Sequence, residues 1–72
     1  MYDLEIFDNC YGVVTGRNST GAYLELDNGS EAYARRYANL KPGTKVMCTV
    51  LKKPKDYYLA LVEIDTVLEY AA

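Results

Sequence analysis

Apolar and polar side chains alternate with a period of two along much of the chain. Between residues 21 and 26, Ala and Leu alternate with Tyr23 and Glu25. Between residues 31 and 35, two alanines alternate with larger polar side chains that include Tyr33. A period of two predicts half-buried strands with one face turned to solvent. The Asn-Gly pair at 28–29 joins the two segments and predicts a β-hairpin, because both residues tolerate positive φ.

Three further strands are predicted outside this hairpin, at residues 11–17, 44–52 and 57–64. The segment 44–52 is apolar on both faces, which is typical of a central strand. Residues 1–9 alternate only weakly and form an N-terminal extension. The tail 65–72 leaves two alternatives open. Thr66 and Glu69 have the spacing of a helical capping box, but the tail could equally prolong the last strand.

The β pattern breaks between residues 35 and 43, where Tyr37, Ala38 and Leu40 predict one helical turn before the Pro-Gly pair at 42–43. Five short strands with this helical turn between the third and the fourth predict an all-β barrel, because closure removes exposed sheet edges. The five-stranded OB-fold fits this order best. We expect a single domain over residues 1–72, with its core at about 10–64.

The composition is that of a folded protein, with half of the residues apolar and a quarter charged. No run is apolar enough to span a membrane, and residues 1–9 lack a secretory leader, so we expect a cytoplasmic protein. Cys10 and Cys48, without any histidine in the chain, predict buried free thiols and no metal site. A disulfide stays open if their strands are neighbours. No nucleophile motif or phosphate-binding loop is present, so we expect no cofactor and no enzyme activity.

The charge is distributed unevenly along the chain. The formal net charge is −2, but residues 9–62 hold all eight basic residues and four acidic ones, a local net charge of +4. The charge on one face decides whether a polyanion binds, so an acidic protein can still bind nucleic acid. Such binding should be weak and sensitive to salt.

Four motifs follow one another at recognisable spacing: Gly-Val-Val at 12–14, Gly-Ala-Tyr-Leu at 21–24, a short strand at 31–34, and Gly, Val, Val and Leu within 43–51. In this order they resemble the S1-type RNA-binding domain, a branch of the OB-fold family, over residues 12–62. The resemblance implies an S1-like OB barrel that binds single-stranded RNA.

The resemblance also implies roles for particular residues. The family's strand-two aromatic falls on Tyr23, whereas a second aromatic falls on Thr20 and is absent. The family's histidine falls on Arg35, which can contact a phosphate or stack on a base. The family's aspartate after the fourth strand falls on Pro54, and its basic residue at the start of strand five falls on Tyr58.

The candidate nucleic-acid-binding face therefore combines aromatic and basic side chains. Its residues are Tyr23, Tyr33, Arg35, Tyr58, Arg17, Lys52, Lys53 and Lys55. Single-strand binders need aromatic faces for stacking beside cations that follow the phosphates. We expect Arg35 rather than Arg36 to take part, because neighbours in a strand point to opposite faces. The alternative is that the tyrosines merely cover exposed strand surface and the lysines form a solvated loop.

The expected function is weak binding of single-stranded RNA, or of single-stranded DNA. The alternative is a protein-interaction or assembly module, including self-association, on an OB barrel that does not bind nucleic acid. The absent aromatic at Thr20, the acidic pI and the apolar tail with Val67, Leu68 and Tyr70 favour this alternative.

Overall fold

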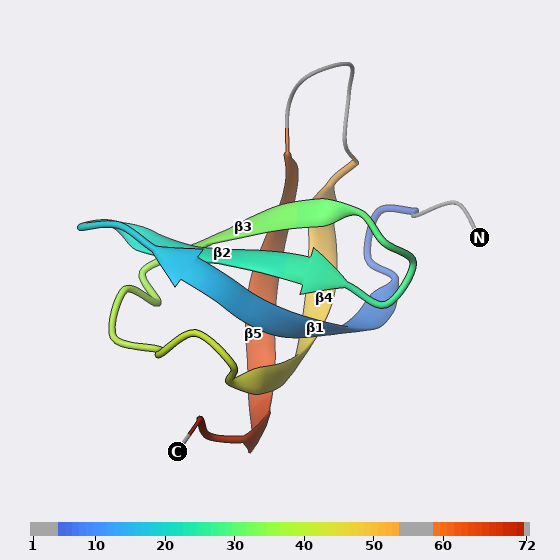
Figure 1. Cartoon of the computed structure of the whole chain (residues 1–72). Coiled ribbons are helices and arrows are strands. Elements are labelled where there is room, and N and C mark those ends of the chain that lie inside the picture. Colours follow the sequence, from blue (N-terminus) through green and yellow to red (C-terminus); the bar gives the residue numbers. More distant parts are fainter. Residues whose placement is uncertain (1–4, 54–58, 72) are drawn as a thin grey trace.

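The structure is a computed structural model that describes residues 5–53 and 59–71. Its five strands are β1 (Asn9–Arg17), β2 (Gly21–Leu26), β3 (Glu31–Arg35), β4 (Lys45–Lys52) and β5 (Ala60–Glu69). They close into a barrel in the order β1-β2-β3-β5-β4 (Figure 1). Neighbouring strands are antiparallel, except that β3 and β5 are parallel. The prediction of an all-β, five-stranded closed barrel is confirmed, and the arrangement fits an OB-like barrel.

The barrel interior is filled by the side chains that the period of two turns inward. Its largest fully buried residues include Leu24, Val14, Val46, Val50 and Val62. The alanines and leucines of the hairpin, predicted to face inward, are buried as well. The aliphatic side chains of all five strands meet in one core cluster, so the outward-facing side chains of the barrel are not needed to form the core.

The helical turn predicted between the third and fourth strands is wrong. No helix occurs in residues 5–53 and 59–71, and the connection after β3 is irregular (Figure 1). Arg36 has a φ of 73°, which a right-handed helix does not allow. Tyr37 packs against the core and donates a hydrogen bond to the Ile64 carbonyl at 3.0 Å, and Leu40 is buried. The contacts of Tyr37 and Leu40 with the barrel thus determine the path of this segment.

The ends of the chain settle one of the open alternatives. β5 continues to Glu69, so the tail prolongs the last strand and does not form a helix. β5 begins at Ala60, and the segment 54–58 before it lies outside the described residues. At the other end, β1 begins at Asn9, two residues before the predicted start.

The two cysteines are directly paired across β1 and β4. Both are buried, and their sulfur atoms are 3.4 Å apart without a disulfide. The prediction of buried free thiols is confirmed. Burial raises the pKa of both the Cys10 and the Cys48 thiol, because a thiolate would lose its hydration inside the barrel.

Candidate nucleic-acid interface

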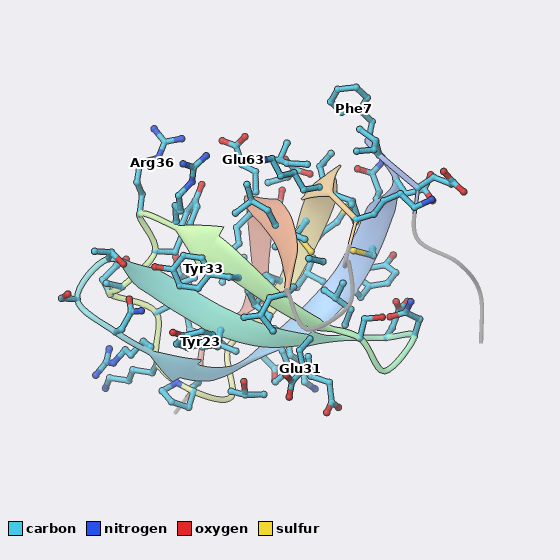
Figure 2. All side chains as sticks on the ribbon, turned by 90° about the horizontal axis from the view of Figure 1, so that it is seen from above. Phe7, Tyr23, Glu31, Tyr33, Arg36 and Glu63 are labelled. Atoms are coloured by element: carbon cyan, nitrogen blue, oxygen red, sulfur yellow. The ribbon has the colours of Figure 1, made fainter. Side chains whose placement is uncertain are left out.

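An aromatic pair lies at the centre of the outer face of β2 and β3. Tyr23 and Tyr33 are cross-strand partners, and the sheet alternation points both side chains away from the core. Their ring centroids are 5.1 Å apart and the ring planes are tilted by 53°. Figure 2 shows the two side chains next to each other on the hairpin. This is the spacing at which aromatic rings attract one another.

The turn between β1 and β2 binds the hydroxyl ends of both rings. Asn18 donates from its amide nitrogen to the Tyr23 hydroxyl at 3.1 Å, and the Tyr33 hydroxyl donates to the Asn18 amide oxygen at 3.2 Å. The hydroxyls of Thr20 and Tyr33 are hydrogen-bonded at 2.5 Å. The Asn18 amide oxygen also accepts from the N–H groups of Thr20 and Gly21, each at 2.9 Å. The turn and the aromatic pair therefore form one hydrogen-bonded unit.

This unit was not predicted from the sequence, in which Thr20 was interpreted only as the position of an absent aromatic. The available signal was the polar cluster at 18–21 next to a tyrosine-bearing hairpin, but such clusters usually bond to their own backbone. Bonding to two tyrosines depends on the register of the strands, which the turn alone does not reveal.

The two tyrosines differ in what they can offer a ligand. A Cβ atom on Gly21 would lie 2.7 Å from the Tyr33 hydroxyl oxygen and 2.8 Å from its ring carbon Cζ, so the Tyr33 ring lies over Gly21. Tyr33 is half-buried, whereas Tyr23 is 38% exposed. Tyr23 is therefore the more accessible of the two tyrosines.

Two arginines lie beside the start of β2, but only Arg35 shares the alternation of the two tyrosines, because the cross-strand partner of Arg17 is the buried Ala22. Arg17 pairs with Ala22 across the β1–β2 ladder, and Arg35 pairs with Gly21 across the β2–β3 ladder. Both side chains are exposed. They lie at the end of the hairpin where the Asn18 turn binds the tyrosine hydroxyls, so cations and the aromatic pair are brought together there.

The expectation that Arg35 and Arg36 face opposite sides came from strand alternation, which does not extend to Arg36. Both arginines line one shallow depression with Glu63. Arg36 lies beyond β3 and has a φ of 73°, so strand alternation does not apply to it. Its guanidinium is 3.9 Å from the Glu63 carboxylate, and the Arg36 side chain is 84% exposed, so this pair binds weakly (Figure 2).

The opposite end of the same face is acidic. Glu25 and Glu31 are cross-strand partners, and both are exposed. A shallow groove of about 290 Å³ runs beside Tyr23 and includes Glu31 and Leu59. The outer face of the hairpin therefore runs from Arg35, past two tyrosines, to two glutamates. The acidic end was not recognised from sequence, because the pairing of the two glutamates depends on register.

The lysines predicted for the site are separated. Tyr33 pairs with Leu61 and Leu61 pairs with Lys52, so Lys52 lies two strands from the aromatic pair, about 10 Å at normal strand spacing. Lys53 instead approaches Glu5 at 3.4 Å. Lys55 and Tyr58 lie outside the described residues.

The described residues contain no group of three or more acidic or cysteine side chains placed to bind a metal ion. Within residues 5–53 and 59–71 there is also no helix long and apolar enough to cross a membrane. Comparisons with protein-family models, with curated proteins and with solved structures found no significant match.

Proposed function

We propose that the protein is an OB-fold barrel of the S1 type that binds single-stranded RNA weakly through the outer face of β2 and β3. The observation that carries the proposal is the Tyr23–Tyr33 pair, in direct cross-strand register and 5.1 Å apart, with Arg35 two residues along β3 on the same face. Stacking on an aromatic ring contributes about 1–3 kcal/mol per base in single-strand binders, and neighbouring cations add the phosphate contacts.

The barrel topology supports the same face. The strand order β1-β2-β3-β5-β4, with a parallel β3–β5 pair, makes β2 and β3 neighbours in a five-stranded barrel, so that their outward side chains share one surface. OB-folds bind oligonucleotides over strands two and three and the loops beside them. Here the first of these loops carries Asn18, which binds both tyrosines.

The charges predict how a strand of RNA would lie. Phosphates are attracted to the Arg17 and Arg35 end and repelled by Glu25 and Glu31 at the other. A strand that crosses the hairpin and the turn before it would contact about two cations, Arg35 and Arg17. Each neutralised phosphate of a single strand contributes about −0.7 to the salt dependence, so we expect a slope of about −1.4.

Binding of a labelled single-stranded RNA, measured by fluorescence anisotropy, tests the proposal. Tyr23→Ala should weaken binding by roughly five- to 150-fold, which corresponds to about 1–3 kcal/mol of lost stacking. Tyr23→Phe should keep most of the affinity, since the ring remains. Arg35→Ala should weaken binding and reduce the salt slope by about 0.7.

Phe7→Ala is the matched control. Phe7 is also aromatic, is 75% exposed and lies apart from the tyrosine pair (Figure 2). Its removal should leave the affinity unchanged. Equal losses in Phe7→Ala and Tyr23→Ala, or no loss in Tyr23→Ala, would reject the proposed face.

A protein-interaction or assembly role remains the second candidate. Leu68 and Tyr70 in the tail are 49% and 72% exposed, which supports it, whereas Val67 is partly buried against the core. Sedimentation velocity at high protein concentration tests the self-association form, which requires a species larger than the monomer.

A further inference from the structure

A second surface, separate from the aromatic face, lies over the outside of β1. A groove of about 470 Å³ runs between β2 on one side and β4 and β5 on the other. We refer to it as the β1 groove, and its lining includes Tyr11, Val13, Glu25, Asp27, Lys45 and Leu68. Its volume is within the range of ligand-binding clefts, which is about 300–1,000 Å³.

The apolar side chains of the groove are not needed to fill the core. Tyr11 is 54% exposed, Val13 39% and Leu68 49%, and none of them belongs to the core cluster. Val13 has Glu25 as its partner on β2 and Lys45 as its partner on β4, so it lies at the centre of a row of three strands. Apolar side chains gathered on an outer barrel face are typical of an interaction surface.

Leu68 reaches the groove through an irregularity in β5. Lys45 pairs with Glu69 and the next residue, Val46, pairs with Val67, so Leu68 has no partner on β4. Such a β-bulge re-aims the side chain of the extra residue, and bulges are common next to functional sites. The bulge thus turns an aliphatic side chain into the groove from a strand that otherwise alternates polar and apolar positions.

The charges around the groove indicate the chemistry of its occupant. The Lys45 ammonium is 3.7 Å from the Glu69 carboxylate, so the one cation of the described lining already has an acidic partner. Glu25 and Asp27 leave the rim negative. A second copy of this groove, or a nucleic acid, would bring negative charge against negative charge. A cationic partner is complementary.

We propose that the β1 groove binds an extended segment of a partner protein in which one Arg or Lys lies between apolar residues. The apolar side chains would contact Val13 and Leu68, and the cation would lie against the Tyr11 ring and the Glu25 carboxylate. A cation over an aromatic ring and next to a carboxylate is attracted by both. The groove and the outer face of the hairpin meet at Glu25 on β2.

An amide NMR titration tests this proposal with the capped peptide Gly-Val-Arg-Leu-Gly and, as its control, Gly-Val-Glu-Leu-Gly. The arginine peptide should give saturable shifts at Tyr11, Val13, Glu25, Lys45 and Leu68, and the glutamate peptide should give none. Leu68→Lys should weaken binding by about tenfold or more, since it replaces an apolar contact with a like charge.

Ile6→Lys is the matched control, because it adds the same charge at a side chain that is 44% exposed and outside the groove. It should bind the arginine peptide as the unchanged protein does. Equal weakening in both variants, or no groove shifts with the arginine peptide, would overturn the proposal. If the protein forms dimers that Leu68→Lys abolishes, a second copy of the chain occupies the groove and the proposal is overturned. If RNA produces shifts at the groove residues, nucleic acid is the occupant and the proposal is likewise overturned.

Discussion

Single residues determine how the aromatic face is built, and Gly21 is the clearest of them. A Cβ atom at this position would come within 2.3 Å of the Ala34 carbonyl oxygen and would also overlap the Tyr33 ring. Any larger residue must therefore displace either the β3 backbone or the ring that supports Tyr23. The sequence showed Gly21 as part of a motif, and the structure shows why a glycine is needed there: the Tyr33 ring lies over it.

We predict that Gly21→Ala destabilises the protein by about 1–3 kcal/mol, the usual cost of forcing extra atoms into a packed site. Thermal unfolding should show this as a fall in Tm of about 4 °C or more. Gly16→Ala is the control, since a Cβ there would meet only Tyr23 Cδ2 at 4.0 Å. A Gly21→Ala protein as stable as Gly16→Ala would contradict the packing described for Tyr33.

The glutamate pair gives a second prediction at this scale. Two like charges directly opposite each other on a sheet destabilise it, and they also repel phosphates from the acidic end. Glu31→Gln should raise the free energy of unfolding by about 0.2–1 kcal/mol. It should also raise RNA affinity about twofold, as expected for one charge removed at about 10 Å in water.

Glu69→Gln provides the comparison, because it changes the net charge equally but lies on β5 beside Lys45. An affinity gain that is the same in both variants would indicate a general charge effect and would argue against RNA on the hairpin.

At the scale of elements, alternation was sufficient to predict the strands but not the connections. β2 and β3 match the predicted segments at both ends, and the other strands differ by one to five residues at their ends. The prediction of a helical turn after β3 was wrong because local propensity favoured a helix, whereas Tyr37 and Leu40 are held by separate contacts with the barrel. The bulges on β5 also left no pattern in the sequence, because they depend on pairing with β4.

The β1–β4 ladder carries a prediction about pH. The pKa of the Cys48 thiol is raised by burial and by its contact with Cys10, so the folded protein keeps the proton where the unfolded chain releases it. Stability is therefore full below the ordinary thiol pKa and falls as the pH rises above it. Between about pH 8 and about pH 10 we expect a loss of about 1–2 kcal/mol from this thiol.

Urea unfolding at several pH values measures this loss. A protein with both Cys10→Ala and Cys48→Ala should be less stable at neutral pH, because methyl groups fill the space of the sulfurs poorly. Its stability should nevertheless change less over the alkaline range. The same alkaline slope in both proteins would show that the buried thiols are not responsible.

At the scale of the whole molecule, the sequence predicted the barrel and the centre of the site. Tyr23, Tyr33 and Arg35 were placed on one face by alternation alone, and the register brings them together. The sequence did not predict what lies around them. The contacts of Asn18, the glutamate pair and the β1 groove all depend on which residues face each other on paired strands, and this register is not evident from the sequence. One barrel thus presents an aromatic face with Arg35 at one end and, over its neighbouring strand, an apolar groove with an acidic rim.

The most direct test of the central claim is an amide NMR titration with a short, mixed-sequence single-stranded RNA, first at low salt and then at physiological salt. We predict shifts at Arg17, Asn18, Tyr23, Tyr33 and Arg35 that become smaller as the salt rises. At low salt even non-specific phosphate contacts should be visible. An absence of shifts at low salt, or shifts confined to the β1 groove, would contradict RNA binding by the outer face of β2 and β3.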